Sequence, residues 1–209
     1  PILEIIIKQL KAKGFNEITL AVGHLSELIM AFFNNGSKYG LKIEYSKEEK
    51  KLGTAGGLGL LKNKLVDDFL VMNGDVLTGL DFSEFLEFHK KTGSIATIAL
   101  NRRHVDIDFG VVELDENRTL IGYIEKPKID YLVSMGVYAF NESILEYIPS
   151  HEYLDIPDLM KRLLSEGEKV NGFIHDGYWL DIGRPDDYIK ANEDIQKIYR
   201  QLGVSIDEA

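Results

Sequence analysis

Cysteine is absent from all 209 residues, which excludes disulfide bonds and metal sites built from thiolates. Basic residues are also in short supply: 24 lysines and arginines stand against 34 aspartates and glutamates, so the formal net charge is -10. Proteins that bind nucleic acid usually present a basic face, so we expect no nucleic-acid partner. An acidic chain can still bind phosphate locally, through a cation, a lysine or a helix N-terminus.

Long hydrophobic runs are missing as well. No apolar stretch approaches the roughly 18 residues that a membrane span requires, and no signal peptide is recognisable. We therefore expect no membrane partner. Together with the lack of cysteine, this pattern leads us to expect a cytoplasmic location.

What is present is typical of a folded domain. Hydrophobic residues make up 44% of the chain and charged residues 28%. The length suits one domain with a sizeable core, so we assign residues 1–209 to a single domain. Pro1 stands at the head of a helical apolar pattern, where proline is well placed. We expect the natural protein to continue upstream of it.

Helices alternate with short apolar strands through the first half of the chain. We expect helices over 1–13, 25–34 and 82–91, and strands over 17–22, 41–45, 69–72 and 94–100. This alternation is typical of βαβ units. It predicts an α/β fold of Rossmann-like type, with a mixed, mostly parallel sheet flanked by helices.

The second half is richer in strands. We expect strands over 110–114, 120–125, 132–140, 169–174 and 178–180, and helices over 143–148, 156–164 and 184–202. Asp115-Glu116-Asn117 is expected to form a hairpin turn. Residues 1–100 and 101–209 are thus interpreted as two halves of one domain.

The segment LGTAGGLG contains four glycines, Gly53, Gly56, Gly57 and Gly59. Small residues let a backbone approach a flat ligand closely, and backbone amides can bind its polar edge. A plain turn leading into a helix is an equal alternative. The dinucleotide pattern GxGxxG and the P-loop pattern both fail to match, which argues against a Rossmann oxidoreductase.

Two aspartates stand at the ends of expected strands. Asp75 follows an apolar run in VMNGDVLTG, and Asp181 follows another in YWLDIG. Two carboxylates at one edge of a sheet could share a Mg²⁺ ion, which prefers oxygen ligands. Each aspartate also has a plainer interpretation: Asp75 as part of an Asn-Gly turn, and Asp181 as the N-cap of the terminal helix.

Glu125 and Lys126 stand side by side at the end of the strand IGYIEKP, where Pro127 stops further sheet pairing. A lysine can bind a phosphate and a glutamate can accept hydrogen bonds from sugar hydroxyls. The alternative is two solvated charges at a turn. The five histidines show no spacing typical of metal ligands, and no Ser-His-Asp arrangement is evident.

These segments, taken in order, resemble the sugar-1-phosphate nucleotidylyltransferases, also called nucleotide-sugar pyrophosphorylases. The resemblance covers nearly the whole chain through PILEIIIKQLKAKGFNEITLAVGH, LGTAGGL, NGDV, DFGVVELDENRTLIGYIEKP, SMGVYAF and GYWLDIGRPDDYIKA. It implies the fold of nucleotide-diphospho-sugar transferases. The halves would then bind the nucleotide and the sugar phosphate respectively.

The resemblance implies a role for each matching residue. Asp75 and Asp181 would hold a catalytic Mg²⁺ and Lys126 would bind the sugar phosphate. Glu125 and Gly136 would contact the sugar. The nucleobase would be surrounded by Leu52, Gly53, Thr54, Ala55 and Gly57. The implied reaction has the sugar-1-phosphate attack the α-phosphorus of a nucleoside triphosphate, with pyrophosphate as the leaving group and no covalent protein intermediate.

Two departures from the family pattern matter. The Gly-rich loop with an arginine, which would hold the triphosphate just upstream of the first helix, is not in this sequence, and neither is the first strand of the sheet. We therefore expect little catalysis from these 209 residues alone. Ser134 stands where related enzymes often carry asparagine, which leaves the sugar open.

The forms LGTAGGL and WLDIG most resemble guanylyltransferases acting on mannose- or heptose-type phosphates. Thymidylyl and uridylyl transfer remain alternatives, as does a homo-oligomeric state. An alternative hypothesis, from a different functional class, is a non-catalytic nucleotide-sugar-binding or regulatory module without the triphosphate loop.

Overall fold

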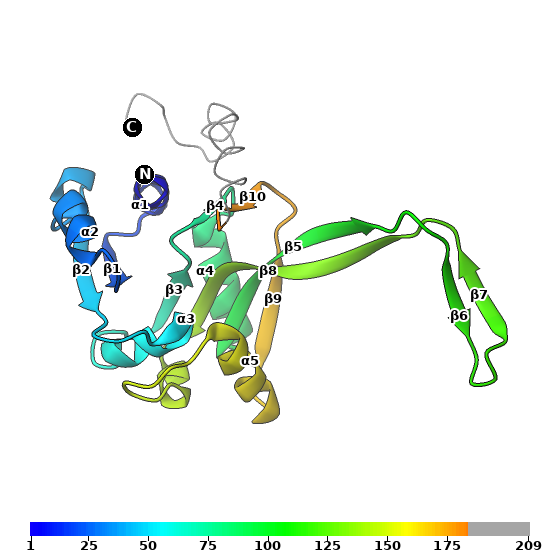
Figure 1. Ribbon diagram of the computed structural model, residues 1–209. Coiled ribbons are helices and arrows are strands. Elements are labelled where there is room, and N and C mark those ends of the chain that lie inside the picture. The colour runs from blue at the N-terminus through cyan, green and yellow to red at the C-terminus, as the bar shows by residue number, and fades with distance from the viewer. Residues whose placement is uncertain (184–209) are drawn as a thin grey trace.

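The computed structural model of the chain describes residues 1–183 (Figure 1). The helix expected over 184–202 lies outside the described residues. Within them, the α/β class with a mixed sheet flanked by helices is confirmed. None of the described helices is both long and apolar enough to cross a membrane.

The first part of the chain is a helix-flanked pair of parallel strands. Its elements are α1 (Ile2–Ala12), β1 (Glu17–Val22), α2 (Ser26–Phe33), the 3-10 turn η1 (Ser37–Tyr39) and β2 (Lys42–Lys47). β1 and β2 pair in parallel, with Glu17 opposite Lys42. The isoleucines of α1 recur at helical spacing. Ile6 therefore packs in a core cluster with Val76 and Leu77, while Ile7 packs in a second cluster with Ile43 of β2.

A four-stranded sheet forms the centre of the molecule, in the order β3 (Asp68–Met72), β8 (Lys128–Asn141), β5 (Ala96–Asp106), β9 (Val170–Ile174). A short separate pair joins β4 (Val76–Thr78) to β10 (Trp179–Asp181). β1 and β2 hydrogen-bond to no other strand among the described residues.

The expected majority of parallel pairings is wrong for the described strands. β1 with β2 and β5 with β9 are parallel, whereas β8 runs antiparallel to both of its neighbours and β4 runs antiparallel to β10. The cause is the return of the chain through β8 into the middle of the sheet. Sequence periodicity reveals a strand but not which strand it will neighbour.

Helices cover the sheet. They are α3 (Gly53–Gly56), the 3-10 segment η2 (Gly57–Leu61), α4 (Phe82–Thr92), the 3-10 segment η3 (Glu142–Tyr147) and α5 (Ile156–Ser165). Asp81 caps α4 by accepting hydrogen bonds from the amides of Ser83 and Glu84. Phe85 of α4 is buried and meets Phe173 of β9 edge to face. Where the sequence predicts a helix over 143–148, the structure has the 3-10 segment η3.

A long two-stranded arm leaves the body of the molecule (Figure 1). β5 continues beyond Leu100, where its pairing with β9 stops, to Asp106. At about 3.3 Å per residue this extension reaches roughly 20 Å. The hairpin of β6 (Val111–Leu114) and β7 (Leu120–Ile124) stands at its end. We call residues 101–133 the arm.

Apolar side chains are exposed along the arm. It carries more than half of the exposed large hydrophobic residues of the described chain: Val105, Phe109, Val111, Val112, Leu114, Leu120, Ile121, Tyr123, Ile124, Tyr131 and Leu132. Since directly opposed residues of an antiparallel pair point to the same face, Val112 with Tyr123 and Val111 with Ile124 make both faces of the hairpin apolar.

His89 of α4 is buried, with only 1% of its surface exposed. Its Nδ1 lies 2.8 Å from Oγ1 of Thr97, and its Nε2 lies 3.5 Å from a carboxylate oxygen of Asp68. Burial lowers the pKa of His89, and the nearby Asp68 carboxylate opposes this shift only in part. The folded chain therefore holds this imidazole more weakly protonated than the unfolded chain does.

We expect this histidine to make the fold sensitive to mild acid. An unfolded histidine has a pKa of about 6.5, so below that pH the unfolded state binds a proton that the folded state binds less readily. The free energy of unfolding should then fall as the pH decreases through about 6.5 towards the lower pKa of the folded state. Urea unfolding at pH 7.5 and pH 5.5 measures this change in the free energy of unfolding. His89→Gln should lose part of that pH dependence, whereas the exposed His24→Gln should keep all of it; the same dependence in His89→Gln would contradict the assignment.

Candidate functional site

The antiparallel pairing of β4 with β10 brings Asp75 and Asp181 together in the backbone. Asp181 stands opposite Val76, and the amide of Ile182 donates a hydrogen bond to the carbonyl of Asp75 at 3.0 Å. Both aspartates are exposed. We call these two residues the carboxylate pair.

Buried neighbours hold this pairing in place. Val76, Leu77 and Thr78 of β4 are almost completely buried, so the strand is anchored in the core. The hydroxyl of Thr78 donates to the carbonyl of Tyr178, and the indole of Trp179 donates to the carbonyl of Met135 at 3.0 Å. The carboxylate pair is thus presented by a rigid support.

Gly136 lies beside this pair. Its carbonyl accepts a hydrogen bond from the amide of Asn73 at 2.9 Å. Its φ is +74°, and a Cβ placed there would lie 2.9 Å from the side-chain nitrogen of Asn73. Only glycine fits this conformation and this close contact without strain. The structure therefore brings three of the predicted site residues, Asp75, Asp181 and Gly136, to one region.

The chemistry of the carboxylate pair fits a magnesium ion. Mg²⁺ is usually held by one or two carboxylates together with waters and substrate phosphates, rather than by a complete protein cage. The described residues contain no group of three or more histidines, cysteines, aspartates or glutamates able to hold a metal. Asp75 and Asp181 are exposed and are joined through the backbone, so these two residues would hold the ion.

The segment expected to surround the nucleobase, residues 52–57, forms helical turns rather than an open loop. Several of its amides are already used: the amide of Thr54 donates to Asp155, and those of Ala55 and Gly56 both donate to the carbonyl of Leu154. We call residues 52–57 the glycine segment. In Figure 1 its helix, α3, lies next to α5 and away from the β4–β10 pair.

Asp155 is the charged centre of these contacts. The hydroxyl of Tyr153 donates to its Oδ2 at 2.6 Å, and the amide of Thr54 donates to its Oδ1 at 3.0 Å. The hydrogen bond from Tyr153, followed by that from the Thr54 amide, lowers the pKa of Asp155. The same bond to Asp155 raises the pKa of Tyr153. Asp155 is therefore an ionised acceptor at neutral pH.

Glu125 and Lys126 lie elsewhere, in the connection between β7 and β8, where the β5–β8 part of the arm meets the β6–β7 hairpin. Glu125 accepts a hydrogen bond from the hydroxyl of Tyr123 at 2.8 Å, and Lys126 adopts a φ of +46°. Both side chains are exposed. Figure 1 shows the end of the arm well separated from β4 and β10. The structure does not bring these two residues to the carboxylate pair within one chain.

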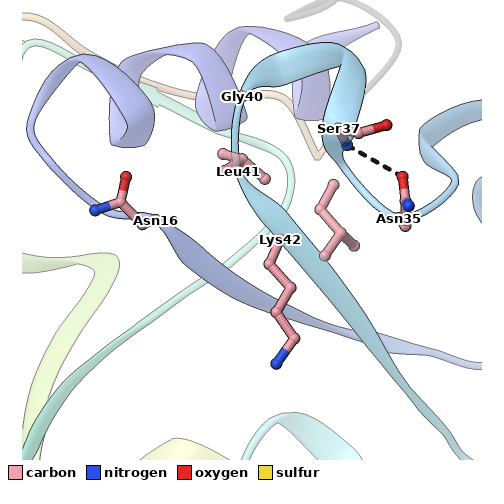
Figure 2. Close-up of a pocket in the computed structure, with 7 residues that line it drawn as sticks. Asn16, Asn35, Ser37, Gly40, Leu41 and Lys42 are labelled. Atoms are coloured by element: carbon pink, nitrogen blue, oxygen red, sulfur yellow. Dashed lines mark hydrogen bonds between the residues drawn. The ribbon is translucent and has the colours of Figure 1, made fainter.

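A shallow pocket of about 630 Å³ lies at the start of β2 (Figure 2). It is lined by Asn16, Asn35, Ser37, Gly40, Leu41, Lys42 and Ile43. The amide of Ser37 donates to the side chain of Asn35 at 3.2 Å. None of the predicted site residues lines this pocket, so we assign no part of the candidate site to it.

Sequence reasoning missed two residues that shape the site. Asn73 was interpreted only as part of a turn, yet it packs directly on Gly136. Asp155 was not singled out, although it binds the glycine segment. A signal for Asp155 existed: it stands just before Ile156-Pro157, where an aspartate is a typical helix N-cap.

Comparison with known proteins identifies the family to which the chain belongs. The family described as "Nucleotidyl transferase" matches residues 1–198, so the chain belongs to the nucleotidyl transferase family. The resemblance to sugar-1-phosphate nucleotidylyltransferases drawn from the motifs is thereby confirmed.

Individual relatives differ in their stated substrates. The chain is 32% identical over 201 residues to a mannose-1-phosphate guanylyltransferase of Mycobacterium tuberculosis, covering 93% of this chain and 56% of the relative. It is 33% identical over 210 residues to a UTP–glucose-1-phosphate uridylyltransferase of Synechocystis, covering 91% and 54% respectively. The chain thus spans about half the length of these curated relatives.

A solved structure confirms the fold. HddC from Yersinia pseudotuberculosis superposes with a TM-score of 0.71 at 22% identity, over 93% of this chain and 84% of that one. The expected nucleotide-diphospho-sugar transferase fold is confirmed by this likeness.

Proposed function

We propose that this chain is the bulk of a sugar-1-phosphate nucleotidylyltransferase. Such an enzyme joins a nucleoside triphosphate to a sugar-1-phosphate and releases pyrophosphate. The pairing of β4 with β10 carries the proposal, because it joins Asp181 in the backbone to the start of β4 beside Asp75, so that two exposed aspartates from distant parts of the chain meet in one region. Membership of the nucleotidyl transferase family supports it.

The residues act by binding and orientation rather than by covalent chemistry. Asp75 and Asp181 hold Mg²⁺, which when bound neutralises negative charge on the reacting phosphates. Leu52, Gly53, Thr54, Ala55 and Gly57 surround the nucleobase. Gly136 contacts the sugar. With the reactants in line, a phosphate oxygen of the sugar-1-phosphate attacks the α-phosphorus of the nucleoside triphosphate. The bond from that phosphorus to the β-phosphate oxygen breaks, and pyrophosphate leaves.

Glu125 and Lys126 complete the proposed sugar-phosphate contacts. Their position in the β7–β8 connection of the arm means that this part of the proposal requires the arm to approach the carboxylate pair when the sugar phosphate binds. Lys126 then supplies a positive charge to the phosphate and Glu125 accepts hydrogen bonds from hydroxyl groups.

For the substrates, we propose a guanylyl donor and a mannose- or heptose-type sugar phosphate. The segments LGTAGGL and WLDIG support this choice, as does the identity to a mannose-1-phosphate guanylyltransferase. One of the relatives is a uridylyltransferase, so family membership alone does not determine the base, and the guanine base is part of the proposal. A single domain over 1–209 and a cytoplasmic location remain predictions from the sequence.

A screen for pyrophosphate release tests the proposal. The intact natural protein is incubated with Mg²⁺, each of the four common triphosphates, and glucose-, galactose-, mannose- or heptose-1-phosphate. We expect the highest rate with GTP and a mannose- or heptose-type phosphate. Highest release with another pair would keep the reaction and change the substrates, and no release with any pair would overturn the proposed enzyme.

The second candidate function is a nucleotide-sugar-binding module without catalysis. The observation that favours it is the separation of the carboxylate pair, the glycine segment and the end of the arm in Figure 1. Binding of a nucleotide-sugar by the intact protein without any pyrophosphate release would support this alternative.

A further inference from the structure

The N-terminus of α5 is capped from another part of the chain. Asp155 occupies the N-cap position, where an aspartate normally accepts hydrogen bonds from the second or third amide of its own helix. Its side chain makes no such bond. Instead the hydroxyl of Thr54 accepts the hydrogen bond from the first helical amide, that of Ile156, at 2.9 Å.

The exchange between the two residues is reciprocal. While Thr54 caps the helix that follows Asp155, one carboxylate oxygen of Asp155 accepts from both the amide and the hydroxyl of Thr54, at 3.0 and 3.3 Å. The second carboxylate oxygen accepts from the hydroxyl of Tyr153. Asp155 therefore fixes both the backbone and the side-chain rotamer of Thr54.

Backbone hydrogen bonds extend this attachment. The carbonyl of Leu154 accepts from the amides of Ala55 and Gly56, both at 2.9 Å, and the amide of Leu154 donates to the carbonyl of Leu52 at 2.8 Å. At the other end, the amide of Leu52 donates to a carboxylate oxygen of Glu48 at 3.2 Å. The glycine segment is thus tied to residues about a hundred positions away in the sequence.

The fit is also close in space. Gly53 has a φ of +79°, and a Cβ there would lie 2.6 Å from the carbonyl oxygen of Leu154. A Cβ on Gly56 would lie 2.5 Å from the carbonyl oxygen of Glu152. Two of the glycines are therefore required by contact with residues 152–155, and not only by a ligand.

We propose that Asp155 is a positioning residue for nucleotide selection, acting through Thr54 on the glycine segment. It holds this segment in one conformation, so that the donors and acceptors that Glu48, Leu154 and Asp155 do not already use keep fixed positions. Selectivity among bases depends on such pre-formed polar groups, because a mobile segment adapts to any base. This inference rests on the proposed function, which places the base against residues 52–57.

Binding measurements on paired variants test the inference. GTP, UTP and dTTP are titrated calorimetrically into the intact natural protein and into its Asp155→Ala, Asp155→Asn and Thr54→Val variants. Asp155→Ala and Thr54→Val remove the hydrogen bonds, so we expect about 10-fold weaker binding of the preferred triphosphate and a smaller difference between the three. Asp155→Asn keeps a hydrogen-bonding group and should stay within about 2-fold of the unaltered protein.

Two controls separate positioning from general loss of structure. Asp158→Ala changes an exposed aspartate in the first turn of the same helix, whose side chain bonds to Lys161, and should leave all three affinities unchanged. Affinity for mannose-1-phosphate should be unchanged in every variant. Amide hydrogen exchange should show that Ala55 and Gly56 lose protection in Asp155→Ala and Thr54→Val.

The outcomes distinguish the two proposals. If the unaltered chain discriminates between triphosphates and the variants discriminate equally well, Asp155 has no positioning role. Equal weakening of all triphosphates and of mannose-1-phosphate would also overturn it, because a structural defect then explains the loss. If the unaltered chain does not discriminate at all, the placement of the base against residues 52–57 fails, and the inference fails with it.

Discussion

Alanine in place of Asp75 or Asp181 is expected to lower magnesium-dependent pyrophosphate release by more than about 100-fold in the intact protein. A bound metal ion can stabilise charge in the transition state by several kcal/mol, and each substitution removes one of the two proposed protein ligands. Since both carboxylates are exposed, the fold should lose little stability. Initial rates over a magnesium titration, together with thermal unfolding of each variant, measure both effects.

Asp176→Ala is a matched control for this experiment. Asp176 is an exposed aspartate five residues before Asp181, in the connection between β9 and β10. Its carboxylate pairs with Arg102 at 3.5 Å. Surface ion pairs of this kind contribute about 0–1 kcal/mol, so activity should be retained. Normal release in Asp75→Ala or Asp181→Ala would exclude the carboxylate pair as the metal site.

Lys126→Ala should raise the KM for the sugar phosphate far more than the KM for the triphosphate. A hydrogen bond to a charged group contributes about 1.5–3 kcal/mol, which corresponds to roughly a 10- to 100-fold change. Steady-state kinetics with each substrate varied in turn measure the two constants. This prediction also tests the arm, because Lys126 reaches the carboxylate pair only if the arm does.

Lys128→Ala serves as the comparison for Lys126. It lies two residues further along, is exposed, and pairs at 3.7 Å with Asp106 across the arm. Its removal changes the charge of the arm by the same amount, so a general electrostatic effect would appear in both variants. Similar changes in both KM values for Lys126→Ala would remove it from the sugar-phosphate contacts.

The carboxylate pair shows what the sequence could predict. Asp75 and Asp181 were grouped because each ends an apolar run, and the structure joins them in the backbone, with Asp181 opposite Val76 and Ile182 hydrogen-bonded to Asp75. The reason differs from the expected one: an antiparallel pair, β4–β10, joins them, rather than neighbouring parallel strands. β4 itself was not predicted: three residues give no periodicity, and no strand was expected over Val76–Thr78.

The glycine segment shows where local rules fail. Glycine disfavours helices, so LGTAGGLG predicts a loop or turn, yet residues 53–61 form helical turns. The bonds that overcome this preference come from Leu154 and Asp155. No pattern within residues 52–61 can indicate partners so distant in the chain. The strand order could not be predicted for the same reason, because β8 lies between β3 and β5 although it comes from far along the sequence.

The apolar arm has a consequence for the behaviour of the chain in salt. A net charge of -10 keeps molecules apart in dilute buffer, whereas the exposed hydrophobic side chains of residues 105–132 favour contact. Repulsion is screened over about 10 Å at 0.1 M ionic strength, while apolar attraction is not weakened by salt. Solubility should therefore decrease as ionic strength rises, and a few charged substitutions on the β6–β7 hairpin would do more to prevent precipitation than a larger net charge elsewhere.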